Sequence, residues 1–202
     1  MIKKIIIASL ALFFFLIQPT VFANSTYGSG NYGDCQYSSC SITITSSAAV
    51  GLNLTPSSSG SCAIGSDSVI VTTHNTNGYF LQLSATTSQT SLNNGPSTIP
   101  STSGTFVAPA ALTTNTWGFR VDGQGGFGAG PTTNLTNPSL STFSGLSIAP
   151  GYTIKTTTTP TPKNTGVDIG DTTVVWYGVC ADSSNKNGTY SDSITYTATA
   201  NP

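Results

Sequence analysis

The sequence contains no glutamate, one histidine and one methionine, and charged residues make up 6% of its 202 positions. Since helix formers such as glutamate, lysine and methionine are scarce, a mainly helical fold is disfavoured. Beyond residue 23 there are four cations and seven aspartates, a formal charge of −3. Nucleic acids and anionic lipid surfaces bind proteins through clusters of basic residues. The sequence has no such cluster, so we expect neither of them as a partner.

Only one long apolar run is present, and it lies at the start of the sequence. It extends from Ile5 to Ile17, follows Lys3 and Lys4, and precedes Val21-Phe22-Ala23. This order is typical of a secretory signal peptide, residues 1–23, cleaved after Ala23. The alternative is a membrane anchor, but the run is shorter than the roughly 20 residues that a helix needs to cross a bilayer. We therefore expect a secreted or cell-surface protein that is not transmembrane once the signal is removed.

The remainder is expected to form one domain, residues 35–202, behind a flexible lead-in, residues 24–34, that is rich in glycine and serine. Four cysteines fall in this part, at Cys35, Cys40, Cys62 and Cys180. An even count in an exported chain indicates two disulfides, and their spacing matches no zinc pattern. Three pairings are possible. We favour Cys35–Cys40, which closes a small loop, with Cys62–Cys180, which joins an early strand to a late one.

Alternation of apolar and polar residues predicts strands along the whole domain. About nine strands of this kind, with turn residues between them, favour an all-β fold, an antiparallel β-sandwich of the immunoglobulin or jelly-roll type. Asn75–Asn77 is expected to close a hairpin between two of the strands. Trp117 and Trp176 are expected to anchor the core. The expected strands are 41–45, 50–55, 68–74, 78–85, 115–122, a short one around Leu146 and Ile148, 152–156, 172–180 and 190–200.

Residues 123–128 read Gly-Gln-Gly-Gly-Phe-Gly, a literal G-x-G-x-x-G. A dinucleotide site needs a helix directly after this motif, so that the pyrophosphate lies at its N-terminus. The following residues contain Pro131 and Pro138 among threonines and asparagines, which is incompatible with that helix. We therefore expect a tight connection and no nucleotide cofactor.

The sequence offers little chemistry of other kinds. His74 is the only histidine and is expected to be an exposed polar residue at a hairpin end, and no G-x-S-x-G nucleophile motif is present. Asp168 and Asp171 lie close together in "GVDIGD", a spacing that suits either a turn or a calcium site. We therefore expect no catalytic residues and no cofactor, with calcium at these two aspartates as the alternative.

Two connections, residues 86–114 and 123–142, are too long for hairpins and are the expected binding surface. Phe106, Arg120, Gln124 and Phe127 are the residues proposed to contact a partner, with Arg120 facing outward from its strand. The alternative for Phe106 and Phe127 is that both fold back over the ends of the sandwich.

Three segments, residues 68–85, 116–131 and 174–200, resemble a group of small secreted surface proteins of ultra-small, host-attached candidate-phylum bacteria. The resemblance implies a secreted β-sandwich on the cell surface. A looser likeness is to W-x-L wall-binding domains, although here Trp117-Gly118-Phe119 and Trp176-Tyr177-Gly178 lack the leucine. The ending "GTYSDSITYTATA" is similar to the last strand of pilin and spore-coat sandwiches, and such a strand suits a sheet edge where a neighbour could add.

Together these features predict a non-catalytic surface protein that contacts the cell envelope, a host surface or copies of itself. A carbohydrate-binding module, with glycan as partner and Tyr37, Tyr79 or Tyr177 as stacking aromatics, is the alternative. A secreted hydrolase is the third possibility and would require two aspartates that converge in a cleft.

Overall fold

The computed structural model describes residues 13–23, 41–47, 49–164 and 167–202, and their fold is all-β. Within these ranges the only helical turn is η1 (Pro138–Leu140). The strands outnumber the nine expected, because β1 lies in the predicted signal peptide and several two- and three-residue strands pair elsewhere, whereas the strand expected around Leu146 and Ile148 does not form. The strands are β1 (Phe13–Ala23), β2 (Ile42–Thr45), β3 (Val50–Leu54), β4 (Ser61–Thr73), β5 (Tyr79–Ala85), β6 (Leu92–Asn94), β7 (Ser97–Ile99), β8 (Ala110–Ala111), β9 (Thr116–Arg120), β10 (Thr142–Phe143), β11 (Tyr152–Thr156), β12 (Lys163–Asn164), β13 (Val167–Asp168), β14 (Asp171–Ala181) and β15 (Tyr190–Ala200).

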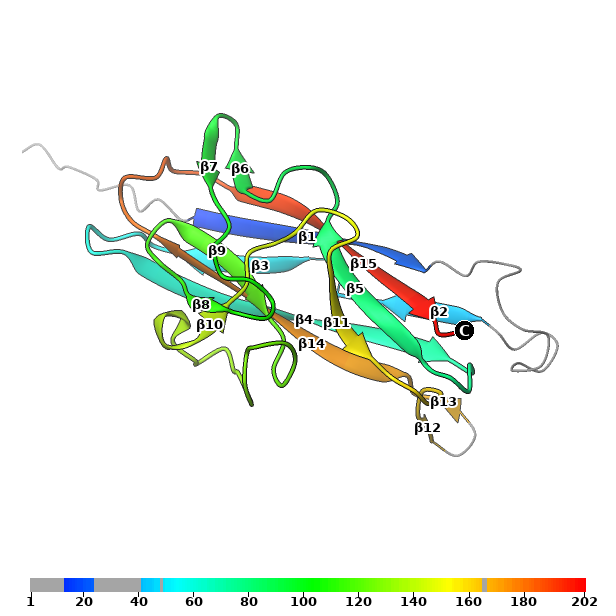
Figure 1. The fold of residues 1–202 in the computed structure, drawn as a ribbon. Coiled ribbons are helices and arrows are strands. Elements are labelled where there is room, and N and C mark those ends of the chain that lie inside the picture. Colours follow the sequence, from blue (N-terminus) through cyan, green and yellow to red (C-terminus); the bar gives the residue numbers. More distant parts are fainter. Residues whose placement is uncertain (1–12, 24–40, 48, 165–166) are drawn as a thin grey trace, which may run out of the picture.

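The larger sheet has the strand order β11-β5-β15-β1-β3, and β6 and β7 extend it beside β15. Its pairs are antiparallel except β1 with β15, which run parallel. Figure 1 shows β1, in dark blue, alongside the red strand β15. The first strand of the chain therefore lies inside a sheet, with β15 on one side and β3 on the other.

The second sheet has the order β2-β4-β14-β9 and is antiparallel throughout. Its central pair, β4 and β14, is in register over eleven residues, from Asp171 opposite Val71 to Ala181 opposite Ser61. Two further ribbons lie outside the two sheets: β8 pairs with β10, which joins the first long connection to the end of the second, and β12 pairs with β13 shortly before β14. The β4–β14 pair is the longest in the described structure and runs through the middle of the second sheet (Figure 1).

The expected hairpin at residues 75–77 is wrong. β4 pairs with β2 and β14, whereas β5 pairs with β11 and β15, so the turn carries the chain from one sheet to the other. Asn75 is buried, and its side-chain amide donates to the carbonyl oxygens of Gly78 (2.8 Å) and Asn201 (2.6 Å). The asparagine therefore ties this crossing to the end of β15, a role that local turn patterns do not reveal.

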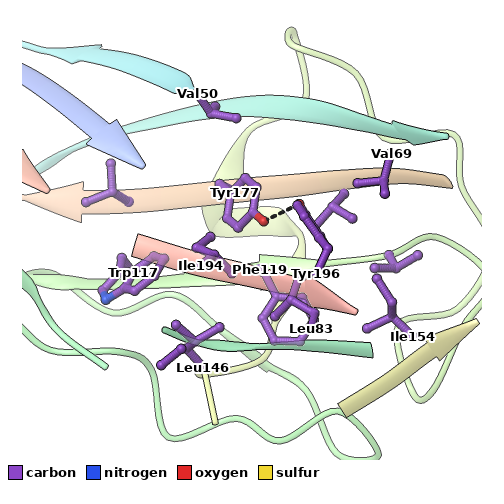
Figure 2. Close-up of a cluster of buried hydrophobic side chains, with 14 of the residues drawn as sticks. Val50, Val69, Leu83, Trp117, Phe119, Leu146, Ile154, Tyr177, Ile194 and Tyr196 are labelled. Atoms are coloured by element: carbon purple, nitrogen blue, oxygen red, sulfur yellow. Dashed lines mark hydrogen bonds between the residues drawn. The ribbon is translucent and has the colours of Figure 1, made fainter. Parts of the chain in front are cut away.

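Residues of both sheets contribute to one hydrophobic core. Figure 2 shows Tyr177 of β14 and Tyr196 of β15 meeting there, and their hydroxyl oxygens are 2.6 Å apart. Burial raises the pKa of both phenols well above the usual value, so neither ionises at physiological pH. Trp117 is fully buried in this core, as predicted, whereas Trp176 is buried but belongs to neither of the described core clusters.

A disulfide joins Cys62 to Cys180, as predicted, and the two residues face one another in the β4–β14 pair. The Cys35–Cys40 pairing and the lead-in, residues 24–34, lie outside the described residues. No helix in the described part of the chain is long and apolar enough to cross a membrane.

Candidate functional site: the two long connections

The glycine-rich segment closes on itself as a compact loop. Gly123, Gly125 and Gly128 have φ values of 70°, 52° and 73°, in the left-handed region that side chains disfavour. The Gly123 amide donates to the Gly128 carbonyl at 2.7 Å, which draws the ends of the loop together. The glycines of the G-x-G-x-x-G motif therefore serve a turn, and no helix begins directly after them.

Phe127, at the tip of this loop, points back into the core and is 5% exposed. Its ring packs edge-on against Phe119 (6.0 Å) and against the half-buried Phe106 of the other connection (5.5 Å). Phe106 in turn stacks on Tyr152 at 5.6 Å. Both phenylalanines proposed as partner contacts thus take the alternative role, covering the core.

Arg120 does not face solvent, which corrects the sequence-based expectation. Its side chain is buried, because the loop that follows β9 folds over it. Nε donates to the Asp122 carboxylate at 2.6 Å and to the Thr132 hydroxyl at 2.8 Å, and the guanidinium lies 5.8 Å from the Phe127 ring centroid. The arginine therefore fastens the two ends of the loop to each other and to β9.

Asp122 is the acceptor at the centre of this arrangement. Burial alone would raise the pKa of its carboxyl, but the Thr132 amide and hydroxyl together with the Arg120 guanidinium outweigh burial and hold the pKa below its usual value. Asp122 is therefore ionised at neutral pH, and its carboxylate is occupied by hydrogen bonds that hold the loop closed.

A shallow pocket of about 520 Å³ lies between this loop and the start of β14. Gln124, Pro131, Lys155 and Val174 contribute to its walls, so Gln124 is the proposed contact residue that borders open space. The Lys155 amine is held by the Asp171 carboxylate at 2.6 Å. Lys155 therefore contributes an ion pair to the pocket wall and not a free positive charge.

Asp168 and Asp171, the proposed calcium ligands, have separate partners. Asp171 accepts from Lys155 and from the Tyr79 hydroxyl at 2.9 Å. Asp168 lies 2.6 Å from Nε2 of His74, which is partly exposed. Across the described residues, no group of three or more histidine, cysteine or acidic side chains could hold a metal ion. The structure therefore does not bring these two carboxylates together around a common site.

Exposed apolar side chains occur on both long connections. Val107 is 80% exposed on the first, and Leu135 and Leu140 are 96% and 85% exposed on the second. The Gly126 amide donates to the Phe106 carbonyl at 2.8 Å, which joins the two connections, and Figure 1 shows β8 of the first connection beside β10, where the second connection ends. The sequence analysis missed these residues, because nothing in the sequence distinguishes an exposed leucine from a buried one.

The aromatics proposed for glycan stacking occupy other positions. Tyr79 and Tyr177 are fully buried, and Tyr37 lies outside the described residues. Of the aromatic side chains whose burial the structure describes, none is in the exposed class. No protein-family model matches the sequence, and no curated protein is detectably similar to it.

Proposed function

We propose that this protein is a secreted, non-catalytic surface protein that adheres through its two long connections, residues 86–114 and 123–142. The observation that carries the proposal is the exposure of Val107, Leu135 and Leu140 on connections that are themselves fixed to the core. Apolar side chains held in water on a rigid support can be buried against a partner at little cost in conformational entropy. The partner is the cell envelope, a host surface or a second copy of the chain.

The arrangement of charged groups supports a non-catalytic role. His74, Arg120 and Lys155 are each paired with an aspartate at 2.6 Å. These pairs hold neighbouring segments of the chain together, and we assign them that structural role. We further propose that the two sheets form a sandwich of the immunoglobulin or jelly-roll type, stapled by the Cys62–Cys180 disulfide and exported behind residues 1–23.

Binding to surfaces tests the proposal. Purified, oxidised protein is co-sedimented with isolated envelopes of the producing cell and of any host, beside the double variant Leu135→Ser, Leu140→Ser. We expect saturable binding that the double variant weakens at least about tenfold, while its unfolding free energy stays within about 0.5 kcal/mol because both side chains are exposed.

The matched control is Val167→Ser, Ile169→Ser, which removes two side chains that are 66% and 55% exposed but lie at the β12–β13 ribbon. This control is expected to bind as the parent does. Absence of binding to every envelope, or an equal loss in both variants, would refute adhesion through the two connections.

A further inference from the structure

The segment that the sequence marks for removal is part of the larger sheet. β1 consists of Phe13–Ala23, the end of the predicted signal peptide, and it lies between β15 and β3 (Figure 1). It is in parallel register with β15 from Phe15 opposite Tyr190 to Ala23 opposite Ala198. It is in antiparallel register with β3 from Phe13 opposite Leu54 to Ile17 opposite Val50.

The strands on either side of β1 both contribute buried side chains to the hydrophobic core. Val50, Leu52 and Leu54 of β3 are buried at alternate positions. Tyr190, Ile194, Tyr196 and Ala198 do the same on β15. Cleavage after Ala23 would take away the strand that joins these two rows, leaving a gap in the sheet directly over the core.

Such a gap is costly in two ways. The backbone N–H and C=O groups of β3 and β15 that face it would lose their partners, and an unpaired edge next to apolar residues is a template for another strand. The apolar side chains bordering it would gain contact with water at about 25 cal/mol per Å² of exposed area. A stable exported protein therefore needs a replacement strand.

We propose that the gap between β3 and β15 is a strand-accepting site, filled after export by an extended segment of a different polypeptide with apolar residues at alternate positions over about nine residues. This inference rests on the proposed export and cleavage of the chain. The partner would complete the sheet through backbone hydrogen bonds and gain specificity from alternate side chains, the mode by which a strand adds to an open sheet.

The composition of the chain itself disfavours a donor from a second copy. After cleavage, the segment ahead of β2 would be residues 24–40, "NSTYGSGNYGDCQYSSC". Its apolar residues are tyrosines and cysteines that never occupy three successive alternate positions, and glycine weakens a strand. Residues 24–40 therefore have no row of apolar side chains that would match Val50, Leu52 and Leu54.

The signal segment fits the position between β3 and β15 incompletely, which indicates that a different strand occupies this position in the exported protein. Pro19 has no N–H to give to the ladder beside Ile194. Ile17 is in register with Asp192, which by alternation shares the side of Tyr190 and Ile194. Asp192 Oδ2 is buried and has no hydrogen-bond partner within the described part of the chain. A natural donor strand would carry a hydrogen-bond donor, such as lysine, opposite Asp192.

Strand exchange tests the site. The full chain is produced without export, oxidised, cut at a protease site placed after Ala23, and mixed with a fluorescent peptide of residues 13–23 between lysine tails. We expect the melting temperature to fall by about 10 °C or more when the cut segment is washed out, and to recover as the peptide binds at one per chain. A peptide with Ile17→Lys should bind about tenfold more tightly at pH 7.5, through a charged pair with Asp192.

Two matched peptides test the alternation. Phe15→Asp changes the position opposite Leu52 and Tyr190 and should abolish binding, whereas Phe14→Asp, opposite the exposed Asn53, should not. An unchanged melting temperature after removal of the segment, or equal binding of both variants, would overturn the site. If a peptide of residues 24–40 displaced the bound peptide, the occupant of the site would be a second copy of this chain and not a different polypeptide. None of these readouts uses envelopes, so failure of the strand site and failure of adhesion are distinguishable.

Discussion

Replacing Phe127 by alanine tests whether the glycine-rich loop belongs to the core or to a binding surface. The ring is 5% exposed and packs against Phe106 and Phe119. Removal of a buried phenylalanine ring costs about 3–5 kcal/mol. We expect the lower end, about 3 kcal/mol, because Phe127 lies on a loop, and a loop can move partly into the space that the ring leaves. For a domain of this size that corresponds to a fall in melting temperature of roughly 6–12 °C.

The assay is thermal and urea unfolding of the oxidised protein, with envelope binding measured on the same samples. Leu135→Ala is the matched control, because its side chain is 96% exposed and its loss should change the unfolding free energy by no more than about 0.5 kcal/mol. We expect Phe127→Ala to lose stability and Leu135→Ala to lose binding. If Phe127→Ala kept its melting temperature while binding fell, the ring would be a partner contact and the reasoning from its burial would be refuted.

Two further predictions concern the disulfide and Asp192. Cys62 and Cys180 are 118 residues apart, so replacing both by serine should lower the unfolding free energy by about 5 kcal/mol in the chain-entropy account, an effect that a reductant should reproduce in the parent and not in the variant. Burial raises the pKa of Asp192 to about 6, against a smaller opposing effect of the Ser193 amide. Because the folded carboxyl binds its proton more tightly than the unfolded one, stability should fall as pH rises from about 4 to 6, and Asp192→Asn should flatten that profile in urea unfolding measured at each pH. A slope that survives in the asparagine variant would assign the effect to another group.

The strands could be predicted because alternation is a local signal. Apolar and polar residues alternate along almost all of residues 190–200, which form β15. The apolar run around Val175 and Tyr177 predicts a strand buried on both faces, and it forms β14. The partner of each strand is not a local property. The turn after Thr73 has hairpin residues, yet it leads to the other sheet, where β5 pairs with β11 and β15, because β2 and β14 already occupy both edges of β4.

The two long connections could be recognised from the sequence as surface, but which of their side chains are exposed could not. Long connections mark the surface, and both carry exposed apolar side chains. Within and beside them the sequence favoured phenylalanine and arginine as contacts, and the structure buries Phe127 of the second connection and Arg120 of β9 while exposing Leu135. Burial of a loop side chain depends on how the loop folds back, here through Asp122 and Thr132, ten residues apart.

One property would let the proposed signal peptide fit the proposed gap between β3 and β15. A signal peptide must be apolar to enter the export path, and a strand between two core-facing neighbours must be apolar on one side. A segment that is apolar at nearly every position, such as Phe13–Ile17, meets the second demand without being selected for it. The features that would distinguish a true donor are therefore those that the signal segment lacks, a backbone N–H at the position of Pro19 and a polar partner for Asp192. A search for the donor should begin from these two positions rather than from apolar content alone.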